Sequence, residues 1–147
     1  MRHGRRMPGY SMVFWAVFIA LVLLPMLALA IEVGRYSYAR GELAKAADAA
    51  ALAAAIEIDR SVFRDTGQVM LTSATWAQAQ AFATANAHYL SGRGVQVVVT
   101  RIEVERQDGT VRVVLSASID RLFPSVVQGI TVSEEALARV RAETWDR

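Results

Sequence analysis

One uncharged stretch, residues 10–31, limits more than any other feature what this chain can fold into. It contains the run VFWAVFIALVLL at residues 13–24, in which every side chain is apolar. At about 1.5 Å of rise per residue, the stretch forms a helix of roughly 33 Å. A bilayer's hydrocarbon core is about 30 Å thick. We therefore predict a transmembrane helix over residues 10–31, with the lipid bilayer as its partner.

A cleaved export signal is the alternative interpretation of this stretch. Basic residues followed by an apolar core are also the layout of a secretory signal, and Ala28-Leu29-Ala30 resembles a small-residue cleavage site. The apolar core of such signals is usually only about 7–15 residues long. The longer stretch in this chain favours a helix that stays in the membrane.

A short basic segment, residues 1–9, precedes the predicted span. It carries three arginines and a histidine, and short segments rich in positive charge usually stay in the cytoplasm. Three basic residues that follow the span, Arg35, Arg40 and Lys45, nearly balance this charge. The orientation therefore depends on the segment being short and dense, which predicts a cytoplasmic N-terminus and an extracytoplasmic C-terminal region.

Pro25 lies inside the predicted span. Proline has no backbone N–H and its ring clashes with the preceding turn, so we expect a kink or a locally opened turn near residues 21–25. Neighbouring helices or local hydrogen-bond shifts can satisfy the backbone groups that are left over. The kink is either harmless or a flexible point that lets an anchor leave the bilayer and pack into an assembly.

The first charges after the span, Glu32 and Arg35, mark the predicted membrane boundary. Tyr36 and Tyr38 suit the headgroup belt, and the arginines suit lipid phosphates. A charge pair at this level can fix the axial register between neighbouring helices, so we predict Glu32 and Arg35 as assembly contacts. Solvation of the pair at the interface is the alternative.

Residues 32–58 read as an Ala-rich continuation of the helix, with the strongest helix propensity in the chain. Leu43, Ala47, Ala50 and Ala54 recur at helical spacing and form one apolar stripe. Small side chains in such a stripe allow another backbone to approach closely. We therefore predict that this stripe packs against a neighbouring element.

Together these features resemble the N-terminal module of the TadE/TadG-like pilus-assembly family. In that family an acidic residue and Gly-Arg close the span, as Glu32-Val33-Gly34-Arg35 do here. A helix with an Ala-Asp-Ala-Ala-Ala-Leu core follows, matched here by residues 47–52. The resemblance covers residues 9–56, and its Ala-Asp-Ala-Ala-Ala-Leu core is distinctive although low in complexity.

The resemblance implies a pilin-like structural or assembly subunit of a Flp, or tight-adherence, type IV pilus or a related secretion system. Such a subunit acts in cell adhesion and resides in the bacterial inner membrane or in an extracellular pilus. Its implied partners are other copies of itself, other pilin-like subunits and pilus-assembly platform proteins.

The resemblance also implies a processing site at Gly9 and Tyr10. Some family members are cleaved after a glycine by a prepilin peptidase and carry Glu at the fifth position of the mature chain. Phe14 stands at that position here. This departure favours the TadG-like side of the family or a permanently anchored subunit.

The rest of the chain predicts a small extracytoplasmic head over residues 74–147. Period-two alternation and the Asp108-Gly109 turn indicate a β-hairpin, with a bulge near Thr100 and Arg101 where the apolar parity shifts. The last segment also reads as a capped helix, but the family resemblance favours a strand. The expected elements are a linker (59–73), a helix (74–91) and strands at 95–105, 110–119 and 130–141. The predicted fold class is α+β and pilin-like: a long transmembrane helix, a second helix and a small antiparallel sheet.

The composition and motifs of the chain indicate no catalytic, metal-binding or cofactor-binding site. The chain has no cysteine, and its two histidines lie far apart at His3 and His88, so we expect no enzymatic activity, metal or cofactor. A net charge of +2 with scattered arginines argues against nucleic-acid binding, and no small-molecule substrate is expected. A membrane-anchored ligand-binding or sensor module is the alternative function. A concave pocket with convergent polar groups would favour it, whereas a bare apolar helix face would favour assembly.

Overall fold

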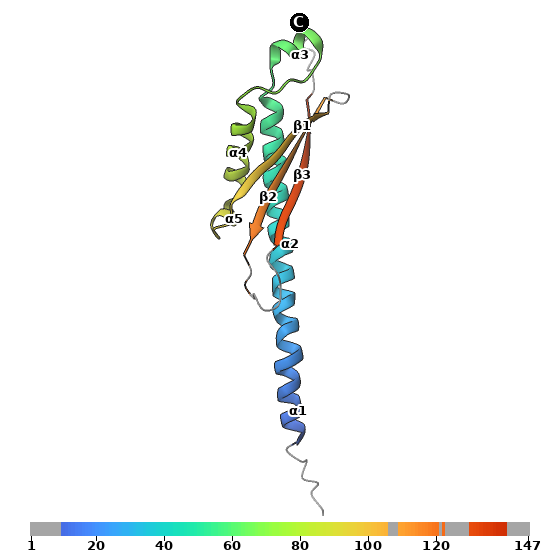
Figure 1. Cartoon of the computed structure of the whole chain (residues 1–147), viewed down its shortest axis with the longest axis vertical. Coiled ribbons are helices and arrows are strands. Elements are labelled where there is room, and N and C mark those ends of the chain that lie inside the picture. The colour runs from blue at the N-terminus through green and yellow to red at the C-terminus, as the bar shows by residue number, and fades with distance from the viewer. Residues whose placement is uncertain (1–9, 106–108, 121, 123–129, 141–147) are drawn as a thin grey trace, which may run out of the picture.

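A computed structural model of the chain describes residues 10–105, 109–120, 122 and 130–140. One helical rod begins at Tyr10, ends at Ile56 and carries a head on its C-terminal half, while its N-terminal half extends away from the head (Figure 1). The rod consists of α1 (Tyr10–Phe18), a π-helical segment η1 (Ile19–Leu23) and α2 (Leu24–Ile56). Every side chain from Met12 to Ile31 is exposed, except the half-buried Ala28.

The π-helical segment η1 lies directly before Pro25, in the region where an opened turn is expected. Because Pro25 has no N–H to donate, the carbonyl one turn earlier loses its usual helical partner. The Leu24 N–H instead donates to the carbonyl of Ile19, five residues back, which widens the turn. The local rearrangement lets the helix continue through the proline.

In the described part of the chain, three strands form an antiparallel sheet in the order β1-β2-β3. They are β1 (Val97–Glu105), β2 (Thr110–Ile119) and β3 (Ile130–Arg139). The register between β1 and β2 shifts between Val99 and Arg101, where the sequence predicts a bulge. Gly109 adopts a φ of 63°, which favours glycine, in the turn before β2. The long helix followed by further helices and this sheet confirms the α+β class.

Short helices connect the rod to the sheet and differ in detail from the expected segments. The segment expected as a linker contains α3 (Arg60–Thr66), whose N-terminus is capped by Asp59. Hydrogen bonds from the Ser61 hydroxyl and the Val62 N–H to the Asp59 carboxylate lower its pKa. The described elements after it are α4 (Thr75–Asn86) and α5 (His88–Ser91).

The segment expected as a single helix over 74–91 is interrupted at Ala87. This residue leaves helical geometry at φ −101° and ψ 34°, and its N–H donates to the Thr84 carbonyl. The interruption lies between α4 and α5. Leu90, on α5, is only 2% exposed and belongs to the core of the head.

The core of the head lies between α2 and one face of the sheet, with α4 against α2 and β1. The helix contributes mainly alanines to this core, and the sheet contributes mainly valines, together with Leu115, from alternate positions. Leu43 and Leu115 are completely buried. The helix therefore supplies a smooth surface, and the sheet supplies the larger side chains that fill the space above it.

Replacing Leu43 with alanine tests this core. Leu43→Ala leaves a cavity under the sheet, and we expect it to lower the free energy of unfolding by about 2–5 kcal/mol. Urea unfolding of the full chain in detergent micelles, followed by Trp76 fluorescence, provides the measurement. Leu52, on the same helix but 59% exposed, is the matched control, and Leu52→Ala should change stability by less than about 0.5 kcal/mol. Equal effects of the two substitutions would contradict the packing described for α2.

Candidate functional site

Glu32 joins the rod to the head at the point where the uncharged stretch ends. Its Oε1 accepts a hydrogen bond of 3.0 Å from the backbone N–H of Leu122, in the connection between β2 and β3. Its Oε2 accepts a second bond of 2.9 Å from Nη1 of Arg35. Glu32 is only 9% exposed, and a buried carboxylate is stable only when its oxygens are satisfied. Both oxygens of Glu32 have partners within the chain.

The structure thus brings together Glu32 and Arg35, the residues predicted at the membrane boundary. They lie three residues apart on α2 and form an ion pair, with the Arg35 side chain 25% exposed. The sequence does not reveal the third partner, because the Leu122 N–H comes from a distant connection without a motif. Glu32 therefore positions the lower end of the sheet on the rod.

Arg40 and Lys45, the other cations that follow the span, are engaged in ion pairs along α2. The guanidinium of Arg40 bonds to the Glu134 carboxylate on β3, and this hydrogen bond raises the pKa of Arg40. Lys45 donates to Glu42 at 2.6 Å, which raises the pKa of Lys45. Arg40, which the sequence places at the lipid phosphates, therefore pairs with the sheet.

An aromatic and cationic cluster lies beside α2 close to the boundary. The rings of Tyr38 and Tyr89 meet edge to face with centroids 4.4 Å apart. Cζ of Arg93 lies 4.2 Å from the Tyr89 ring centroid, in the geometry of a cation–π contact. Arg35, Arg93 and Asp120 line one small cavity of about 40 Å³ next to this cluster. No motif in the sequence indicates that Tyr89 and Arg93 meet Tyr38, since Arg93 is a lone arginine in a Gly-rich turn.

The predicted packing stripe is buried inside this chain's own head. Leu43, Ala47, Ala50 and Ala54 are all 0% exposed and belong to the core that α2 forms with the sheet and α4. A partner helix cannot reach them while the head is folded. The apolar surface that remains accessible on the rod consists of the segment Met12–Ile31, Val33, Tyr38 and, further along α2, Leu52 and Ile56.

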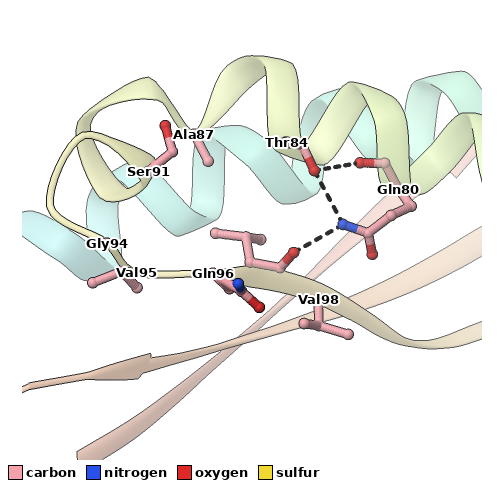
Figure 2. A pocket seen from close by; sticks show the side chains of 9 residues that line it. Gln80, Thr84, Ala87, Ser91, Gly94, Val95, Gln96 and Val98 are labelled. Atoms are coloured by element: carbon pink, nitrogen blue, oxygen red, sulfur yellow. Dashed lines mark hydrogen bonds between the residues drawn. The ribbon is translucent and has the colours of Figure 1, made fainter.

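A second, larger cavity of about 460 Å³ lies between α4, α5 and β1. Figure 2 shows Gln80 reaching from α4 to the edge of β1. Its Nε2 donates to the Val97 carbonyl at 2.8 Å, and its Oε1 accepts from the Val99 N–H at 2.8 Å. Nε2 also lies 3.1 Å from the hydroxyl of Thr84. The Gln80 amide thus pairs with β1 in place of a further strand.

This arrangement suits protection of an edge strand. Unpaired backbone groups at a sheet edge attract other strands, and Gln80 occupies two of those groups on β1. Among the described residues that line the cavity, all are Gln, Thr, Ser, Ala, Gly or Val, and none is ionisable. The polar groups of Gln80 and Thr84 are therefore already used to hold α4 against the sheet.

The predicted processing site lies at the limit of the structure. Gly9 falls outside the described residues, and Tyr10 is the first residue of α1. The geometry of the site therefore adds nothing to the prediction made from its sequence.

Gln80 provides a test of the edge-strand contact. Gln80→Leu removes both bonds to β1, and we expect amide hydrogen exchange at Val99 to become at least about tenfold faster, which corresponds to about 1.4 kcal/mol of lost protection. Exchange is measured by NMR on the full chain in micelles. Gln78→Leu is the matched control, because Gln78 lies on the same helix and is exposed. Unchanged exchange at Val99 in Gln80→Leu would contradict the role assigned to the amide.

Comparison with known families finds a match for the rod and not for the rest of the chain. No curated protein and no solved structure matches the chain. Residues 9–57 match the family model described as Putative Flp pilus-assembly TadE/G-like. The match contains the apolar segment, the Glu32–Arg35 pair and the Ala-rich part of α2, whereas α3, α4, α5 and the sheet lie outside it. In its N-terminal third, this chain is similar to the TadE/G-like pilus-assembly family, as its residues predict.

Proposed function

We propose that this chain is a membrane-anchored, pilin-like subunit of a Flp pilus or a related secretion system. It acts by packing its rod against the helices of neighbouring subunits in a filament or a membrane platform. The observation that carries the proposal is the division of the rod into two halves. One face of the C-terminal half is buried under the head, and the N-terminal half is apolar and uncovered.

The uncovered half requires a nonpolar environment. Within the described residues, the helix Met12–Ile56 is long and apolar enough to cross a membrane, and its most apolar stretch is not buried in the chain. An apolar surface of this size is not stable in water. Lipid covers it when the subunit is alone in the membrane, and neighbouring helices cover it after assembly.

Because the head covers the packing stripe, we expect partners to contact the rod mainly along its uncovered N-terminal half. The packing stripe is used within the chain, so it fixes the head to the rod. The Glu32–Arg35 pair lies at the junction, and in this proposal the partly exposed Arg35 sets the axial register of adjacent rods while the buried Glu32 holds Leu122. The head then determines which subunits fit next to one another.

The cavity beside β1 supports the alternative, a membrane-anchored ligand-binding or sensor module, only by its volume. A volume of about 460 Å³ falls within the usual range for small-molecule pockets. However, binding sites usually carry polar groups that are available to a ligand. Here Gln80 and Thr84 are bonded to each other, and Gln80 is also bonded to β1. The assembly function therefore agrees better with the structure.

The proposed location is the bacterial inner membrane, with the N-terminus in the cytoplasm and the head outside. The support is the dense basic segment before the apolar stretch and the tendency of such segments to remain cytoplasmic. In this orientation, the head can contact extracytoplasmic subunits of a pilus.

Cysteine cross-linking along the apolar segment tests helix packing. The chain has no cysteine, so single cysteines at successive positions from Met12 to Leu24 report separately on each face of the rod. We expect cross-linked adducts, either with a second copy or with another membrane protein, to recur every three to four positions, because one helix face meets the partner. The matched control is Ala50→Cys, which the head covers. Absence of adducts at every position in native membranes would overturn the packing proposal.

Mass spectrometry of the chain from membranes and from sheared extracellular material tests processing. Because Phe14 replaces the Glu that processed relatives carry, we expect the uncleaved chain in the membrane fraction. Phe14→Glu, which restores that residue, should increase the fraction that begins at Tyr10, and Phe18→Glu is the control. A wild-type chain that begins at Tyr10 in the sheared fraction would contradict this expectation. A start near residue 31 would show that the apolar segment is an export signal.

A further inference from the structure

We infer that the head rests on the bilayer through a membrane-side rim, defined as Arg35, Tyr38, Tyr89, Arg93 and Leu122. Its partner is the phospholipid headgroup layer of the leaflet that the rod leaves on the side of the head. This inference rests on the membrane anchor proposed above. It adds a second membrane contact, made by residues that lie up to 90 positions away from the anchor in the sequence.

Leu122 is held at the level of the membrane boundary. Its N–H bonds to Glu32, and Glu32 is the first charged residue after the uncharged stretch. The side chain of Leu122 is nevertheless 54% exposed. An exposed leucine fixed at this level contacts the interface between headgroups and acyl chains, where an apolar side chain is more stable than in water.

The tyrosine and arginine cluster lies slightly further from the hydrocarbon core. Tyr38 follows Glu32 by six residues, which corresponds to about 9 Å along the helix. The headgroup region extends roughly 5–7 Å beyond the hydrocarbon core on each side. By these values the backbone of Tyr38 lies about 2–4 Å beyond the headgroups. Helical side chains tilt toward the N-terminus of the helix, so the edge-to-face pair of Tyr38 and Tyr89, with Arg93 stacked on Tyr89, reaches the outer margin of the headgroups. Aromatic and basic residues are enriched at this depth.

Arg93 supplies a positive charge at this end of the head. Arg40 and Lys45, higher on α2, are both paired with carboxylates. In the part of the chain that the structure describes, Arg93 contacts a tyrosine ring and forms no ion pair. Its guanidinium donors therefore remain available for phosphate oxygens, which arginine binds well. Figure 1 shows α5, directly before Arg93 in the chain, at the end of the head nearest the exposed half of the rod.

Depth measurements with single labels test the rim. Cysteines introduced by Leu21→Cys, Leu122→Cys and Leu137→Cys are spin-labelled in the full chain. The protein is placed in nanodiscs of phosphatidylcholine and phosphatidylglycerol, and accessibility is measured with oxygen and with a water-soluble nickel chelate. Leu137 is the matched control, because it is 58% exposed and pairs with Arg112 at the other end of the sheet.

We expect the label at residue 122 to be protected from the nickel chelate and accessible to oxygen, like the label at residue 21. The label at residue 137 should be accessible to nickel. A lipid-buried label at residue 21 with a label at residue 122 as water-accessible as that at 137 would overturn the rim and leave the anchor intact. A water-accessible label at residue 21 would overturn the anchor itself, and the rim with it.

Charge reversal separates the contribution of Arg93. In the Leu122→Cys background, Arg93→Glu places a negative charge against lipid phosphates, and we expect the label to lose its protection from nickel. Arg64→Glu makes the same charge change on α3 and should have no effect. Unchanged protection in Arg93→Glu would overturn the assignment of Arg93 to the lipid phosphates.

Discussion

The close packing of α2 on the sheet is the interaction on which the rest of the head depends. A small sheet of this kind is only marginally stable by itself, because one of its faces must be covered before the strands are stable in water. Alanines at the contact let the strands approach the helix, so the valines and Leu115 of the sheet can fill the interface. The helix is long and continuous through this region, and it therefore serves as the rigid element on which the strands are arranged.

The same helix divides the molecule into a part that is stable in water and a part that is not. After Glu32, one face of the rod is covered by its own head, and before Glu32 the side chains are apolar and exposed. Glu32 lies at this division and bonds to both the helix and the connection between β2 and β3. The buried carboxylate thus adds a contact between the rod and the head at this division, while the packing stripe fixes the head to the rod. This geometry suits a subunit that must present its head at a constant height above a membrane or a filament axis.

Much of the fold follows from local patterns in the sequence. The uncharged stretch, the Asp108-Gly109 turn and the parity shift at the bulge are each signals carried by a few neighbouring residues. The short helix α3 also carries local signals, an Asp59 N-cap and Gly67 with a φ of 70° at its C-terminus. The interruption at Ala87 lacks a comparable signal, because alanine suits several conformations. Similarly, Gln80 gives no local indication that its amide pairs with β1, since that contact depends on where α4 lies relative to the edge of the sheet.

The sequence by itself determined the apolar segment, the opened turn before Pro25, the Ala-rich helix and the β-hairpin, because helical and strand periodicity depend on residues close together in the chain. It also identified Glu32 and Arg35 as a pair. Only the tertiary structure decided what the packing stripe of α2 contacts. An apolar stripe predicts that one face of a helix is buried, but it does not identify the element that buries it. The tertiary structure likewise brought Leu122 to Glu32, and it brought Tyr89, with Arg93 over its ring, to Tyr38. These residues come from separate connections and elements, and chain folding alone sets the distances between them.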